Sequence, residues 1–190
     1  MWADNKYEVP VGMAQLEEQA AAGLMVNHST ATAIGTAIKE RMVELNMPCT
    51  EMGSPSVYLR EPTTFFIAFS MTTDGGAAIC DYFMENWKED RAPRFAFFTM
   101  DNAAGRSIEV PGLVNYIESK GFEIVGSQYY PCPCVSPPTT QLTWLKENGV
   151  DLTFGSSVTV AAAPCMKEAN RLGMGPDKAY KITFGWAGLF

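Results

Sequence analysis

The sequence has few cationic residues and no long apolar run, and these shortages exclude several classes of protein. Lys and Arg together number 14 against 21 Asp and Glu, so the formal net charge is -7. Nucleic-acid binding is not expected, because phosphate contacts need clustered Lys and Arg. No stretch approaches the roughly 20 apolar residues of a membrane helix. The opening MWADNKYEVPVG also lacks the charged and apolar regions of a signal peptide.

The motifs of common enzymes are missing as well. There is no GxSxG, no Gly-Lys-Ser or Gly-Lys-Thr of a phosphate loop, and no GxGxxG after a strand. The single histidine, His28, is adjacent to Ser29, and adjacent residues cannot easily form the hydrogen bond of a nucleophile and its base. Asp101 lacks the further acids and the Lys of a phosphorylation site, so we expect it to cap a helix. No metal or cofactor is predicted.

The cysteines give only a weak signal. Of the five, only Cys132 and Cys134 are close together, with a Pro between them. Zinc and redox sites usually use CxxC spacing, often with a second pair or with histidines. Buried or loop thiols are therefore the favoured interpretation. A cysteine-dependent enzyme that uses Cys132 or Cys134 as its nucleophile remains an alternative.

What the chain does have is a repeated alternation of apolar runs and helical patterns. About six strands alternate with about five helices, which predicts an α/β fold with three-layer αβα lobes and mostly parallel sheets. A helix at 11–22 precedes them. The expected strands are 24–27, 65–69, 95–99, 122–129, 150–154 and 180–184, with a short one at 49–52. The expected helices are 33–45, 74–87, one running to about 120, 140–147 and 158–172.

Polar loops follow several of these strands. They cover residues 28–32, 53–58, 101–104 and 155–157 and are rich in Ser, Thr, Asn, Gly and Ala. Each alone is best explained as helix capping. Four of them at the carboxyl ends of strands, where open α/β sheets bind ligands, favour a binding site. Trp186 follows the last strand and is a candidate for packing on an apolar part of the ligand.

The order of these segments resembles the type 1 periplasmic binding proteins, in particular the branched-chain amino-acid (Leu/Ile/Val) receptors of ABC transporters. No single motif is specific, but the ordered set covers nearly the whole chain. The matching stretches are LMVNHST at 24–30, NMP at 46–48, MGSPS at 52–56, FFIAF at 65–69, TDGGAA at 73–78, FAFF at 95–98, DNAAG at 101–105, LTWLKENGVD at 142–151 and ANRLG at 169–173.

The resemblance implies a protein that binds a solute between two lobes without chemistry and delivers it to a membrane permease, in the periplasm or otherwise outside the cytoplasm. Residues 1–72 would form part of the first lobe and 73–190 most of the second, so the chain is expected to be a central part of a longer protein. A hinge is expected near 70–74. The implied ligand contacts are Ser29, Thr30, Gly53, Ser54, Asn102, Ala104, Ser156, Ser157 and Trp186.

The chain departs from the amino-acid receptors at two of these places. Those receptors tend to have an aromatic residue near 102–104 and an acid near 186–188, where this chain has Ala103-Ala104 and Trp186-Ala187-Gly188. A carboxylate without an ammonium group, an amide or an aromatic acid therefore fits at least as well as an aliphatic amino acid. A ligand-sensing domain of a regulator or receptor is an alternative. Because an incomplete first lobe would expose a sheet edge, pairing with a second copy is also expected.

Overall fold

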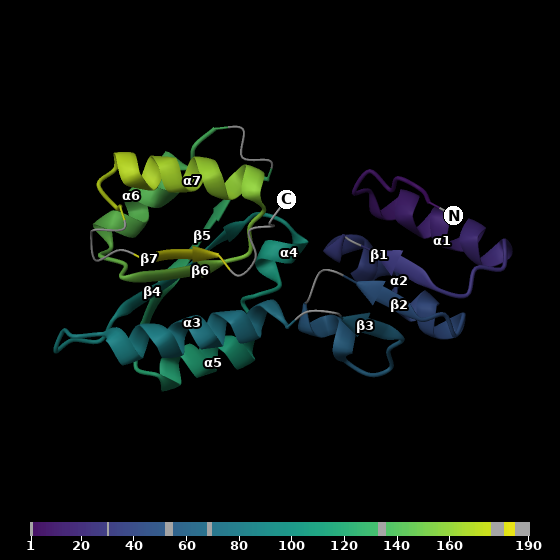
Figure 1. Cartoon of the computed structure of the whole chain (residues 1–190), viewed down its shortest axis with the longest axis horizontal. Helices are drawn as coiled ribbons and strands as arrows, with labels where there is room; N and C mark the ends of the chain where they lie inside the picture. The colour runs from purple at the N-terminus through teal and green to yellow at the C-terminus, as the bar shows by residue number, and fades with distance from the viewer. Residues whose placement is uncertain are drawn as a thin grey trace. The chain divides into compact units, whose positions relative to one another are not determined.

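The chain divides into two compact units, Met1–Met71 and Thr72–Phe190. The computed structural model describes residues 2–29, 31–51, 55–67, 70–132, 136–175 and 181–184. Figure 1 shows the helices and strands of both units, and each unit is described here by itself. The assignment of the units to two lobes of a longer protein stays a proposal.

The first unit is a small parallel sheet with helices packed against it. The strands pair in the order β1-β2-β3, and all pairs are parallel. Its core joins buried residues of the two helices, such as Leu16 and Ile38, to Cys49 and Phe65 of the strands. The elements are α1 (Val9–Ala21), β1 (Asn27–Ser29), α2 (Thr32–Glu44), β2 (Cys49–Glu51), the 3-10 helix η1 (Ser56–Leu59) and β3 (Phe65–Ile67).

The prediction of a strand at 24–27 is wrong. The strand is Asn27–Ser29, and the apolar run before it is largely exposed, with Met25 82% and Val26 55% accessible. The parallel ladder decides this, because Asn27 pairs with Cys49 and Ser29 with Glu51. An apolar run of three residues does not reveal whether a neighbouring strand will pair with it.

The second unit is built around a four-stranded parallel sheet in the order β5-β4-β6-β7. Its strands alternate with helices along the chain. The elements are α3 (Thr72–Asn86), β4 (Arg94–Met100), α4 (Ala103–Arg106), α5 (Pro111–Ser119), β5 (Glu123–Tyr130), α6 (Thr139–Glu147), β6 (Leu152–Gly155), α7 (Thr159–Arg171) and β7 (Lys181–Phe184). The predicted α/β class with parallel sheets is confirmed.

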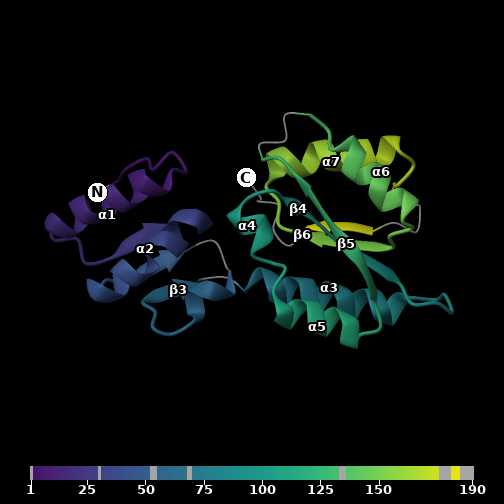
Figure 2. The same cartoon turned by 180° about the vertical axis from the view of Figure 1, so that it is seen from behind.

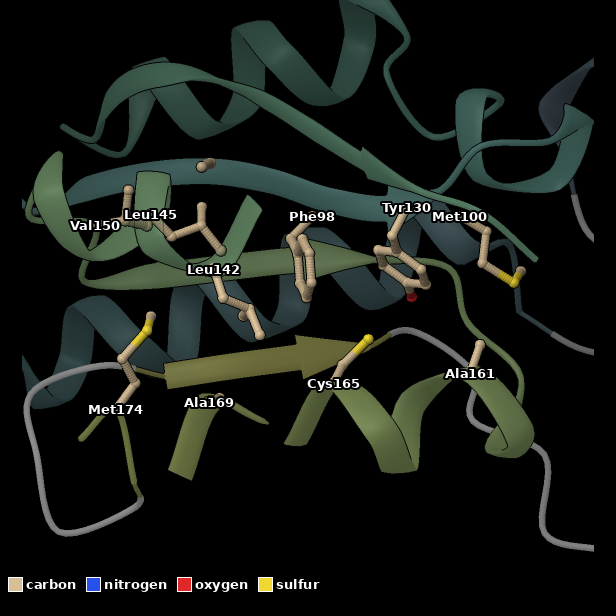
Figure 3. Packing of buried hydrophobic residues seen from close by; sticks show 11 residues of the cluster. Phe98, Met100, Tyr130, Leu142, Leu145, Val150, Ala161, Cys165, Ala169 and Met174 are labelled. Atoms are coloured by element: carbon tan, nitrogen blue, oxygen red, sulfur yellow. The ribbon is translucent and has the colours of Figure 1, made fainter. Parts of the chain in front are cut away.

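The central strand β4 has apolar side chains on both faces, and each face is covered by helices. Phe95 and Phe97 belong to the cluster that includes residues of α3 and α5. Phe98 belongs to the opposite cluster, with residues of α6 and α7. Both views in Figures 1 and 2 show the sheet between these two helical layers. In Figure 3, Phe98 and Tyr130 lie side by side in the second cluster, with ring centroids 4.8 Å apart.

One predicted helix is split in two. The pattern after residue 101 predicts a continuous helix to about Lys120, but α4 ends at Arg106 and α5 begins at Pro111. A proline has no N–H to give to the preceding turn and is tolerated at a first helical position, so it starts a new helix here. Gly121, predicted to end that helix, has a φ of +92°. No helix among the described residues is long and apolar enough to cross a membrane.

Candidate functional site

The carboxyl ends of β4 and β6 form the place where the second sheet is best suited to bind a small molecule. From β4 the chain passes through α4 and α5 to β5 on one side, and from β6 it passes through α7 to β7 on the other side. The connections therefore leave this point in opposite directions. In open parallel sheets, such a reversal opens a crevice beyond the carboxyl ends of the two adjacent strands.

Hydrogen bonds tie the ends of these two strands together. The backbone N–H of Met100 donates to the carbonyl oxygen of Ser156 at 3.3 Å. The backbone N–H of Ser156 in turn donates to the hydroxyl oxygen of Thr99 at 3.1 Å. Thr99 is fully buried. The predicted loops at 101–104 and 155–157 thus start from one cross-linked junction.

Asn102 has the capping role that the sequence assigned to Asp101, so that prediction is wrong. The side-chain oxygen Oδ1 of Asn102 accepts a hydrogen bond from the backbone N–H of Gly105 at 2.9 Å and begins α4. Asp101 instead forms an ion pair with Arg106 at 2.7 Å. Asn102 and Ala104 are both partly exposed, so both remain accessible from solvent.

The two candidate serines after β6 differ from each other. Ser156 is partly exposed, whereas Ser157 is fully buried and donates to the carbonyl oxygen of Val158 at 3.3 Å. Ser157 therefore has a local structural contact, and Ser156 is the accessible hydroxyl of the pair. The next helix, α7, starts directly after them.

The candidates of the first unit are only partly described. Ser29 ends β1 with 5% of its surface exposed, and its hydroxyl oxygen has no hydrogen-bond partner in the described part of the chain. It was expected in a loop, but pairing with Glu51 places it in the strand. The other candidates, Thr30, Gly53, Ser54 and Trp186, lie outside the described residues.

Sequence reasoning missed a buried acid beside Ser29. Glu51, 1% exposed, ends β2 among apolar residues. Burial, together with the carboxylate of Glu51, raises the pKa of the Cys49 thiol to about 12. Burial and Glu51 also raise the pKa of Tyr58, which donates a hydrogen bond to the carbonyl oxygen of Thr32 at 3.0 Å. The one sign of this buried acid in the sequence is its position within the short strand expected at 49–52.

Sequence reasoning also missed a polar cluster on β5. Glu109 accepts hydrogen bonds from the hydroxyls of Ser127 at 2.7 Å and Tyr129 at 2.6 Å. The guanidinium of Arg106 stacks over the Tyr129 ring, 4.1 Å from its centroid. Burial and the bond to Glu109 raise the pKa of Tyr129. Arg106 also pairs with Asp101, so this cluster connects β5 to the loop that carries Asn102.

Four of the five cysteines lie in the described residues, and three of these four are buried. Cys49, Cys80 and Cys165 are buried and unbridged. Burial raises the pKa of Cys80 to about 12, which disfavours a reactive thiolate. Cys132 is exposed, and Cys134 lies outside the described part. Within that part no three His, Cys, Asp or Glu side chains gather to hold a metal ion.

The described strands and helices define an α/β protein with parallel sheets. The chain belongs to the periplasmic binding protein family, whose model matches residues 1–189. The resemblance found in the sequence is confirmed at this level. No curated protein matches the chain in sequence.

Several solved structures share the fold at low sequence identity. A branched-chain amino-acid ABC transporter protein from Thermus thermophilus with bound valine is 18% identical with a TM-score of 0.82, over 95% of this chain and 46% of that one. A solute-binding protein from Rhodopseudomonas palustris BisB5 with 3,4-dihydroxybenzoic acid is 17% identical with a TM-score of 0.76, over 97% and 50%. A fatty acid substrate-binding protein from Thermomonospora curvata is 16% identical with a TM-score of 0.78, over 96% and 45%. The chain thus spans about half the length of these proteins.

Proposed function

We propose that this chain is part of a solute-binding protein of an ABC transporter, acting outside the cytoplasm. The membership in the periplasmic binding protein family carries the proposal. The sheet reversal at the ends of β4 and β6 supports it, because it supplies a surface where a small ligand can bind. The protein binds and releases its solute without making or breaking a bond, and a membrane permease receives it.

The ligand is a small organic acid, an amide or an amino acid. Two features support this breadth. The accessible residues at the strand ends, Asn102, Ala104 and Ser156, are small or polar and carry no charge that would select one kind of ligand. The similar structures carry ligands as different as valine and 3,4-dihydroxybenzoic acid. The family alone therefore does not select an aliphatic amino acid.

In such a protein the two lobes close on the ligand, and the permease would bind the closed form. A ligand that contacts both lobes shifts the population toward the closed form. We propose the lobe boundary near 70–74, together with ligand contacts from Ser29, Thr30, Gly53 and Ser54 on the first lobe. Pairing of two copies finds no support in the comparisons.

A thermal-shift screen of the 190-residue chain tests this function. The probes are L-valine, 3,4-dihydroxybenzoate, octanoate, their primary amides and urea. A ligand that binds only the folded state adds about 2.7 kcal/mol when present at about 100 times its Kd. For a domain of this size the melting temperature then rises by several degrees.

Two serine variants show whether a positive result belongs to the proposed surface. Ser156→Ala removes the accessible hydroxyl after β6 and should reduce the ligand-induced rise. Ser119→Ala makes the same change on the exposed end of α5, where the hydroxyl donates to the carbonyl oxygen of Tyr116. It should leave the rise unchanged. A flat screen across every probe would contradict the proposed function.

A further inference from the structure

The carboxyl ends of β1 and β2 bring a buried hydroxyl and a buried acid side by side. Ser29 is the last residue of β1 and Glu51 the last residue of β2, and the two are partners in the parallel ladder. Side chains of partner residues in a parallel pair point to the same face of the sheet. Ser29 is 5% exposed and Glu51 1% exposed, so both belong to the face that the helices cover.

The carboxylate of Glu51 lies beneath the first turn of α2. A Cβ added to Gly35 in that turn would be 3.1 Å from the Oε2 atom of Glu51. The positive end of the helix dipole favours a negative charge at this position. Burial and this carboxylate together raise the pKa values of Cys49 and Tyr58. Glu51 is therefore a source of negative potential at the end of the first sheet.

The hydroxyl of Ser29 is the second observation, and it points to a bound molecule. Its oxygen is buried and has no hydrogen-bond partner in the described part of the chain. A buried polar atom that stays without a partner costs free energy, so it normally pairs with a water or a ligand. A serine hydroxyl can accept or donate. The adjacent carboxylate decides which kind of group is favoured, because it attracts a donor and repels an anion.

We propose that Ser29 and Glu51 select a solute that presents a hydrogen-bond donor, an ammonium or hydroxyl group, to the first unit. The inference rests on the proposed function and deepens it, because it assigns the polarity of the solute at this place. A carboxylate of the solute is excluded here, since it would lie beside the carboxylate of Glu51. A solute that carries an acid group therefore directs it away from Ser29.

Matched pairs of probes test this selection on the wild-type chain. L-Valine and isovalerate share a branched chain and a carboxylate, and only L-valine has an ammonium group. 3,4-Dihydroxybenzoate and benzoate share a ring and a carboxylate, and only the first has hydroxyl donors. The Kd of each probe is measured by isothermal titration calorimetry. In any pair that the chain binds, we expect the member with the donor to bind at least tenfold more tightly.

Glu51→Gln tests the role of the acid, because it keeps the size of the side chain and removes its charge. We expect the preference for the member with the donor to fall by about a factor of ten, mainly through a higher Kd of that member. Glu40→Gln is the matched control, since it makes the same change at an exposed position of α2. It should change neither Kd. Circular dichroism checks that both variants are folded.

The outcomes separate this inference from the function on which it rests. Equal binding of both members of a pair by the wild type would overturn the selection and leave the solute-binding function standing. This comparison needs no variant, so it decides the question even if Glu51→Gln does not fold. A preference that persists in full in folded Glu51→Gln would overturn the role of Glu51. No binding of any probe by the folded wild-type chain would overturn the proposed function and this inference with it.

Discussion

Gly155, at the end of β6, lies close to the backbone of β4. A Cβ added there would be 1.8 Å from the carbonyl oxygen of Phe98 and 3.0 Å from Cα of Thr99. Backbone atoms of a central strand cannot move aside as the end of a flexible side chain can. The absence of a side chain is therefore required for the two strand ends that form the candidate site.

We expect Gly155→Ala to destabilise the second unit by about 3 kcal/mol, the upper end of the range for overpacked cores. Urea unfolding followed by circular dichroism measures the loss. Gly112→Ala is the control, because nothing lies within 4 Å of a Cβ there and the residue is in the first turn of α5. It should be stabilising by about 0.5 kcal/mol, since alanine favours the helix. Equal stability of the two variants would contradict the close approach.

Asp151 shows that a residue in the family-like GVD stretch has a structural role. Its carboxylate accepts two hydrogen bonds of 2.7 Å from the guanidinium of Arg91 and one of 2.8 Å from the backbone N–H of Arg94. The side chain of Asp151 is 5% exposed, whereas that of Arg91 is 46% exposed. The pair fixes the loop before β4 to the start of β6, at the edge opposite the candidate site.

Asp151→Asn should therefore destabilise the chain by about 2 kcal/mol. The value is that of hydrogen bonds to a buried charge, reduced because solvent screens the exposed Arg91. Ligand affinity should be unaffected, because the change is at the other edge of the sheet. Asp90→Asn makes the same change at an exposed neighbour and serves as the control in the same urea titration. A loss as large in the control would show that only net charge matters.

At the scale of the elements, local patterns predicted helices and strands well where the residues themselves decided them. The strand β4 could be predicted from the sequence because apolar residues on both faces suit a strand covered by two helical layers. α3 starts at Thr72, two residues before the start expected at Asp74, which lies instead in the first turn. Two predictions at this scale were wrong. The position of β1 depends on its pairing with β2, a strand that is distant in sequence. The break between α4 and α5 depends on Pro111.

Glu168 of α7 connects helices α6 and α7 through a hydrogen bond from Thr139. Glu168 accepts hydrogen bonds from Arg171 and from the hydroxyl of Thr139, and these bonds lower its pKa from 4.5 to about 2. The unfolded chain therefore binds a proton in this range before the folded chain does. Stability from the contact is fully present above pH 4.5 and is lost as the pH falls toward 2.

We expect the wild type to lose stability more steeply than Glu168→Gln over this range, measured by urea unfolding at a series of pH values. Glu17 and Asp81 also have lowered pKa values, but they contribute equally to both proteins. Glu147→Gln, an exposed change on α6, should behave as the wild type. Parallel pH profiles for wild type and Glu168→Gln would contradict the role of Glu168 in holding the two helices.

At the scale of the whole molecule, the chain forms two units and spans about half the length of the solved proteins that it resembles. The transport role, the permease and the ligand therefore belong to the proposal and depend on the binding screen. Among the candidate residues described in the second unit, Asn102 and Ser156 are the accessible polar side chains.

The sequence by itself determined the α/β class, the helix end before Gly121, and the polar loops that follow the strands. These features depend on residues that are neighbours along the chain. Only the tertiary structure decided that the ends of β4 and β6 lie together, that Ser29 faces the core beside Glu51, and that Asn102 rather than Asp101 caps α4. Strand order and side-chain partners depend on contacts between distant segments, and no local pattern specifies which segments meet.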